Sequence, residues 1–314
     1  MANTLSFANS IDNTDAAKFI PEVWSDDVIA GYKKNLVLGN LVSKINHKGK
    51  KGSKINIPAP VRGSASAKAA NNVVTLVTTT ASEVEVTIDQ HYEYSFLIED
   101  ITETQALSSL RRFYTDDAGY ALATQVDTAI RTLAATWNSG AAYTGGVIGS
   151  DGSTAWSPTA NTNTGNGAAL TDAGIRRVIQ TLDDNDVPMA GRVLVIPPVE
   201  KRRLLGVTRF TEQAFTGEAG AGNSIRNGLV GDIYGNAVYV SSNIATLLAT
   251  DASTSYRPCL YFHKDALVLA EQLGVRVQAQ YKQEALGTLV TADRLYGVQT
   301  VRAEGCRAII VPTL

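Results

Sequence analysis

The chain has 314 residues and a nearly balanced charge, with 28 basic side chains against 30 acidic ones. This balance excludes a dedicated nucleic-acid-binding protein, because that class usually carries a clear basic excess. Hydrophobic residues make up 44% and charged residues 18%, which excludes a disordered chain and is consistent with a folded protein whose small-residue surfaces are buried against partners.

The first segment, 1–46, predicts an N-terminal arm followed by a helix. Residues 1 to about 20 are polar with scattered apolar positions. Pro21 then favours a helix start, where a missing N–H costs nothing. Gly39-Asn40 predicts the end of that helix.

Residues 47–98 predict an extended two-stranded loop. Polar and apolar residues alternate in Lys54–Ile57 and again in Glu83–Asp89, as in strands. The small polar run between them, 62–72, predicts the loop tip. Two strands of roughly 15 residues reach about 50 Å, and an isolated hairpin of that length is marginal in water. We therefore expect this loop to lie on a neighbouring subunit.

Residues 99–170 predict a long helix followed by loops. Thr102–Gln105 has the form of a capping box, and apolar residues then recur every three to four positions as far as Trp137, with Gly140 as the expected end. About 33 helical residues would span about 50 Å. This helix is expected to serve as a spine.

The remainder, 171–256 and 257–314, predicts a mixture of short helices and strands. Thr171-Asp172 caps an expected helix, Arg192–Ile196 is an expected buried strand, and 199–205 a second short helix. Residues 217–228 are glycine-rich and predict a loop. Strand patterns then return from Leu260 to the end. The order of elements indicates an α+β protein in which one section is inserted between the halves of another.

Motifs for catalysis, metal binding or cofactors are absent from the sequence. The three histidines are scattered, and no phosphate loop, dinucleotide fingerprint or nucleophile elbow occurs. We expect no enzyme, no cofactor and no metal. No apolar run reaches membrane-spanning length, so we also expect no membrane partner.

The two cysteines, Cys259 and Cys306, are expected to be buried free thiols in a reducing cytoplasm. A bridge between them or between subunits remains the alternative.

One basic cluster stands out near the start of the extended loop. It could contact nucleic acid or an acidic patch on a neighbour, or it could be a solubilising strand edge that prevents mispairing. With two basic residues of the loop tip, the candidate contact residues are Lys44, Lys48, Lys50, Lys51, Lys54, Arg62 and Lys68, with His47 beside them.

The order of elements resembles the major capsid proteins of tailed bacteriophages, whose fold encapsulin shells share. Three sequence segments support the resemblance. They are 187–198, an expected strand followed by two prolines; 228–241, a glycine-containing turn that leads into an expected strand; and Ala266–Ala270 with the expected strands around Gly297. It covers most of the chain from about residue 20. It implies an N-terminal arm and helix in 1–46, an extended β-hairpin loop in 47–98 and a peripheral domain with a spine helix in 99–170. It further implies an inserted axial domain in 171–256, with 217–227 near the capsomer axis, and strands in 257–314 that return to the peripheral and axial domains.

The resemblance implies a structural subunit that assembles as hexamers and pentamers into an icosahedral shell around double-stranded DNA. Assembly is expected in the cytoplasm of a bacterial host, with a portal and, because the arm has only about 20 residues, a separate scaffolding protein. The alternative is an encapsulin-like compartment for protein cargo. Loop lysines are present, but no partner for a covalent cross-link can be assigned.

Overall fold

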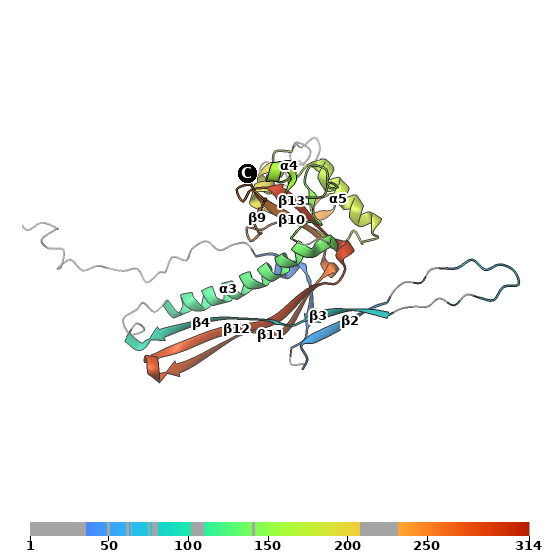
Figure 1. Ribbon diagram of the computed structural model, residues 1–314. Coiled ribbons are helices and arrows are strands. Elements are labelled where there is room, and N and C mark those ends of the chain that lie inside the picture. The colour runs from blue at the N-terminus through green and yellow to red at the C-terminus, as the bar shows by residue number, and fades with distance from the viewer. Residues whose placement is uncertain are drawn as a thin grey trace, which may run out of the picture.

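The computed structural model describes an elongated molecule with a compact unit at one end and a slender limb below it (Figure 1). The described residues are 36–48, 51–60, 63, 65–74, 76, 81–101, 110–139, 142–207 and 232–313. The predicted helix after Pro21, the Thr102–Gln105 capping box and the glycine-rich loop 217–228 lie outside them.

The limb is built on a four-stranded sheet in the order β1-β11-β12-β4. β11 and β12 form a long antiparallel hairpin, β4 pairs antiparallel with β12, and the short β1 runs parallel to the first part of β11. The bounds are β1 Ser43–Asn46, β4 Gln90–Glu99, β11 Leu267–Lys282 and β12 Gly287–Thr300, with a 3-10 turn, η4, at Gln283–Ala285.

Helix α3 (Leu110–Leu133) lies along one face of this sheet (Figure 1). Ala118 and Leu122 of the helix pack against Ala292 of β12, and the chain continues in the 3-10 segment η2 (Ala134–Ser139). The buried positions follow the three-to-four spacing of the sequence, so the predicted spine helix is confirmed from Leu110 onward. The described α-helix of 24 residues is about 36 Å long.

A second hairpin crosses the other face of the sheet. Strands β2 (Lys54–Pro60) and β3 (Ala81–Thr87) pair antiparallel and form a sheet of their own. The hairpin projects beyond the sheet toward the side away from the β11–β12 tip (Figure 1). The predicted two-stranded excursion is therefore present, but its paired strands have 7 residues each and are shorter than expected.

The compact unit contains a seven-stranded mixed sheet, in the order β5-β13-β10-β6-β8-β7 with β9 beside β10. β7 and β8 are joined by Tyr234-Gly235, both at positive φ, as a type I′ hairpin turn requires. The bounds are β5 Val147–Ile148, β6 Arg192–Ile196, β7 Asp232–Ile233, β8 Asn236–Val240, β9 Leu247–Leu248, β10 Ser255–His263 and β13 Cys306–Pro312.

Both faces of the seven-stranded sheet are buried, and successive residues of each central strand face opposite cores. In β6, Val193 and Val195 pack in one core and Leu194 and Ile196 in the other, so the predicted buried strand is confirmed. The covering helices are α5 Asp172–Asp184 and α6 Pro198–Leu204, with the short segments α1 Leu38–Leu41, α4 Ala160–Asn163, η3 Lys264–Ala266 and η5 Ala303–Gly305 elsewhere along the chain.

One continuous core joins the two units. It contains Ile130 and Trp137 from the end of the spine, Phe262 from the seven-stranded sheet, and Leu267 and Tyr296 from the limb sheet. Because these side chains pack together, the end of the spine fixes the limb against the compact unit.

The predicted segment boundaries need correction at one place. Residues 90–98, assigned to the extended loop, belong to β4 in the limb sheet, where Tyr94, Phe96 and Ile98 share the face that α3 covers. The seven-stranded sheet combines strands of 171–256 with β13 and most of β10 from the expected return strands of 257–314, and with β5 from before residue 171.

Candidate assembly surface

The tip of the β2–β3 hairpin exposes apolar side chains. Val73, Val74 and Leu76 are 89%, 64% and 87% exposed, although each would bury favourably by roughly 1.5 to 3 kcal/mol. The described residues 65–74 are exposed throughout. Three apolar side chains within four positions on a projecting tip indicate a surface that another molecule covers.

The base of the same hairpin is fixed on its own chain. Val86 and Ile88 pack with Val268 and Ala270 of β11, and a Cβ at Gly297 would collide with the backbone of Thr87 and Ile88. Only glycine permits this approach of one backbone to another. The hairpin therefore crosses the sheet at a fixed point while its tip reaches outward.

A second exposed apolar group lies on the outer half of β11. Val275, Val277 and Tyr281 are about half exposed, at 50%, 52% and 49%. Val277 pairs with Ala292, a residue that packs against α3. The three exposed side chains therefore lie on the α3 side of the sheet, but beyond the part of that face that the helix buries. Leu286, at the hairpin turn, is 66% exposed.

The opposite face of the limb sheet carries a charged network. Arg276 donates two hydrogen bonds to Asp293, from Nε at 2.7 Å and from a terminal nitrogen at 2.9 Å, and His91 Nε2 lies 3.1 Å from the same carboxylate. Hydrogen bonding to Arg276, with a further contribution from His91, lowers the pKa of the Asp293 carboxyl. These side chains connect β11, β12 and β4 on the face opposite α3, which the β2–β3 hairpin crosses.

A buried carboxylate anchors the start of the described chain. Asp127 of α3 is 3% exposed and accepts hydrogen bonds from the backbone N–H groups of Val37, Leu38 and Gly39 at 3.0, 3.3 and 2.8 Å. Burial raises the pKa of Asp127, and these three hydrogen bonds oppose the rise. The carboxylate satisfies the free N–H groups at the start of α1.

The structure separates the predicted basic contact residues. Lys48 forms an ion pair with Glu271 at 3.3 Å and Lys54 with Glu85 at 2.7 Å, while Lys44 donates to Asn40. Hydrogen bonding to Lys54 lowers the pKa of Glu85. Of the other basic residues, Lys51 and Lys68 are exposed and His47 is partly buried. Lys50 and Arg62 lie outside the described residues.

These residues do not form one patch, because Lys54 begins β2 at the base of the hairpin and Lys68 lies in the segment 65–74, beyond the end of β2. Sequence reasoning missed the Asp127 anchor and the Asp293 network, since their partners are distant in sequence. It also missed the exposed apolar side chains Val73, Val74 and Leu76. The sequence signal that could have found them is a run of apolar residues directly after a polar loop tip.

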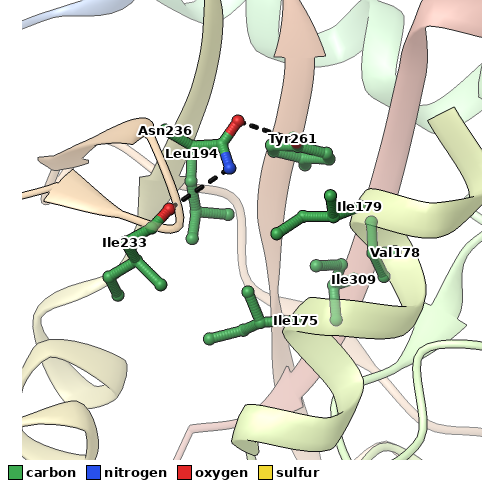
Figure 2. Close-up of a pocket in the computed structure, with 8 residues that line it drawn as sticks. All are labelled: Ile175, Val178, Ile179, Leu194, Ile233, Asn236, Tyr261 and Ile309. Carbon is green, nitrogen blue, oxygen red and sulfur yellow. Dashed lines mark hydrogen bonds between the residues drawn. The ribbon is translucent and has the colours of Figure 1, made fainter. Parts of the chain in front are cut away.

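A small, mostly apolar cavity lies inside the compact unit. Figure 2 shows a cavity of about 10 Å³ between α5 and the sheet, lined by aliphatic side chains and by Asn236 and Tyr261, which has room for at most one water molecule. Tyr261 donates to Asn236 Oδ1 at 2.9 Å, and Asn236 donates to the carbonyl of Ile233 (Figure 2). Asn236 thereby holds the β7–β8 turn.

A larger polar pocket of about 290 Å³ lies beside His263, Arg302 and Glu304. His263 Nε2 lies 2.8 Å from the carbonyl of Ala190, and its Nδ1 accepts from the N–H of Asp265. Both ring nitrogens are therefore engaged, which leaves this histidine unsuited to proton transfer in the pocket.

The cysteines are free and fully buried. Cys259 and Cys306 belong to opposite cores of the seven-stranded sheet, so they cannot bridge, and the prediction of free thiols is confirmed. Burial raises the pKa of Cys306 to about 12, which makes its thiol unreactive at neutral pH.

Within the described part of the chain, no group of three or more His, Cys, Asp and Glu side chains could hold a metal ion. Asp183, one of three neighbouring aspartates, instead forms an ion pair with buried Arg192 at 2.7 Å. No described helix is both long and apolar enough to cross a bilayer.

Comparison with known proteins identifies the family. A family model described as phage capsid protein matches residues 36–309, whereas no curated protein matches the chain. A solved structure of Mycobacterium phage Che8 is 25% identical, with a TM-score of 0.71 over 93% of this chain and 97% of that one.

Two further structures share the fold at lower identity. The capsid structure of the cyanophage P-SCSP1u has 18% identity and a TM-score of 0.72 over 99% of both chains. The capsid of Ralstonia phage GP4 has 15% identity and a TM-score of 0.69 over 99% of this chain and 98% of that one. These matches favour a phage capsid over an encapsulin-like compartment. The chain belongs to the phage capsid protein family, and it is a major capsid protein, a structural subunit of the virion shell.

Proposed function

We propose that copies of this chain assemble as hexamers and pentamers into a closed icosahedral shell around double-stranded DNA. The observation that carries the proposal is the β2–β3 hairpin, whose base is fixed by Gly297 and whose tip exposes Val73, Val74 and Leu76. A neighbouring copy that covers the tip would bury this apolar surface, and many such weak contacts become strong collectively.

The elements have separate roles in this proposal. The hairpin is the extended loop, α3 the spine of a peripheral domain, and the compact unit the axial domain that surrounds the capsomer axis. Because Trp137, Phe262 and Tyr296 share one core, each subunit is expected to behave as a rigid body. Hexamers and pentamers would then differ mainly by small tilts between neighbouring subunits. A separate scaffolding protein and a portal complete the expected partners, with assembly in the host cytoplasm.

Electron microscopy of the purified recombinant protein, over a range of protein and salt concentrations, tests the proposal. We expect closed shells with six- and five-fold capsomers. A monomer that remains dispersed under every condition, with or without a co-expressed scaffolding protein, would contradict it.

We further propose that Lys44 and Lys51 make non-specific phosphate contacts with the packaged DNA. Their support is their exposure and the absence of an acidic partner for either in the described part of the chain, whereas Lys48 and Lys54 are partly neutralised by glutamates. The logarithm of the DNA-binding constant falls linearly with the logarithm of the salt concentration, and each lost phosphate contact reduces the magnitude of this slope by about 0.9.

Fluorescence anisotropy with labelled duplex DNA measures that slope. The double variant K44Q/K51Q should show a smaller slope than the wild type, and the matched control Lys282→Gln, at the far end of β11 from β1, should not. Equal slopes for all three proteins would remove these two lysines from the DNA-facing surface.

A further inference from the structure

Helix α3 leaves one strip of the sheet face that it shares uncovered. The outer half of the helix packs over β12 and β4, where Leu122 packs with Ala292 and the ring centroid of Tyr114 lies 5.5 Å from that of Phe96. Three apolar side chains of β11 lie beside the helix on the same face and are each about half exposed: Val275, Val277 and Tyr281. They span about 20 Å along the strand. This β11 strip is an apolar surface that a further element can cover.

The first described residues lie at the inner end of the β11 strip. Backbone N–H groups at the start of α1 bond the Asp127 carboxylate of α3, and α1 leads into β1, which pairs with β11. Leu122 lies level with Val277, because Ala292 packs with the one and pairs with the other. Asp127 is about 8 Å further along the helix, toward the compact unit. Residue 36 therefore lies on the β11 side of α3, next to the strip.

The sequence before residue 36 predicts an element that matches the strip. Pro21 favours a helix start, and Trp24, Val28 and Tyr32 recur at a spacing of four, which places them on one helical face. Charged residues fall on the opposite face: Glu22, Asp26, Lys33 and Lys34. A helix over 21–35 would be about 22 Å long, close to the length of the strip.

We propose that residues 21–35 form an amphipathic helix that packs on the β11 strip of the same chain, with Trp24 and Val28 against Val275 and Val277. The same chain can fill the strip without a linker, because residue 36 already lies at its inner end and the helix matches its length. A segment from a second copy would have to approach beside this attached chain. The inference concerns the single subunit and goes beyond the proposed shell. It leaves the tip of the β2–β3 hairpin as the apolar surface for neighbours.

Thiol labelling of the dispersed, full-length subunit tests the packing. The variant V277C places a thiol in the strip, while Cys259 and Cys306 are fully buried and should stay unreactive. Adding W24D/V28D should release the helix, because an aspartate cannot remain against an apolar face without a partner. We expect maleimide to label V277C at least roughly tenfold faster in that background, which corresponds to about 1.4 kcal/mol of packing free energy.

Matched controls separate packing from a general loss of structure. The change D26A/K33A lies on the opposite helical face and should leave the labelling rate of V277C unchanged. The variant L97C lies on the sheet face opposite α3 and is exposed, so its labelling should be fast with and without W24D/V28D. Continued protection of Cys259 and Cys306 in the W24D/V28D background reports that the body remains folded.

Cross-linking identifies the chain that supplies the helix. Oxidation of V28C/V277C, which needs no aspartate substitution, should link the two thiols within one chain and shift the mobility of the monomer under denaturing electrophoresis. A mixture of the V28C and V277C single variants under assembly conditions should give no covalent dimer. The inference is overturned if V277C labels as fast as L97C in the otherwise unmodified chain, if V28C/V277C gives no link within the chain, or if the mixture gives dimers, which would assign the helix to a neighbouring copy.

Discussion

Individual charged residues hold together parts of the chain that are far apart in sequence. Asp127 contacts residues 88 to 90 positions away, and His91 meets Asp293 across 202 positions. A single sequence shows the aspartates but not their partners, because helical and strand periodicity reports only local neighbours. These anchors therefore could not be predicted, while the burial of Cys259 and Cys306 could.

Replacing Asp127 should weaken the attachment of α1. In Asp127→Ala the N–H groups of Val37, Leu38 and Gly39 lose their acceptor in a buried site, which costs about 1–3 kcal/mol. Chemical denaturation of the unassembled subunit measures the free energy of unfolding. The exposed Arg112→Ala on the same helix serves as control, and an equal effect of the two changes would refute the anchoring role.

The stability of the limb sheet should fall in acid through Asp293. The folded pKa of this carboxyl is lowered, first by hydrogen bonding to Arg276, so its contribution is present above the unfolded pKa of about 3.9. It is lost as the pH falls through the lower folded value. Asp293→Asn should remove this part of the pH dependence. Unfolding free energies of the two proteins should differ at pH 7 and converge as the pH falls below the lowered folded pKa; a constant difference would exclude Asp293 as the source.

At the scale of elements, periodicity predicted most of the compact unit. Thr171 caps α5 by accepting a hydrogen bond from Gly174 N–H, and β6 is buried on both faces, as its continuous apolar run indicated. The sequence prediction was wrong where two consecutive strands that belong to different sheets follow each other almost directly. Only Ile88-Asp89 separates β3 from β4, so the alternating pattern ran on and residues 90–98 were assigned to the loop.

The crossing point of the hairpin should depend on Gly297. A methyl group there would collide with the backbone of Thr87 and Ile88, so Gly297→Ala should destabilise the subunit by roughly 1–3 kcal/mol through overpacking. Gly119→Ala is the matched control, because a Cβ at that site on α3 meets nothing within 4 Å and alanine favours helices by about 1 kcal/mol. Thermal denaturation should show opposite shifts, and shifts of the same sign would argue against the close approach.

Shortening the hairpin tip should separate assembly from folding. Residues 65–74 are exposed, so replacing 65–72 with a short glycine-serine linker removes almost no intrachain packing. We expect an unchanged melting temperature of the free subunit and a lower yield of particles in electron micrographs. Wild-type particle yield from this variant would show that the tip is dispensable.

The whole molecule combines a rigid body with an incomplete surface. The core around Trp137 and Phe262 joins limb and compact unit, while exposed apolar residues gather at the two hairpin tips and along β11. Composition indicated surfaces that partners bury, and the order of elements indicated the fold. The location of those surfaces required the three-dimensional placement of β11 beyond the cover of α3.

Hydrogen exchange of the β2–β3 hairpin tip tests the central claim, that a neighbouring subunit in the shell covers the apolar surface that this tip exposes in a single chain. Mass spectrometry of dispersed subunits and of assembled shells would compare backbone amide exchange over residues 65–76 in the two states. The account predicts rapid exchange in the free subunit and strong slowing in the shell. Equally rapid exchange in intact shells would show that no neighbour covers the tip.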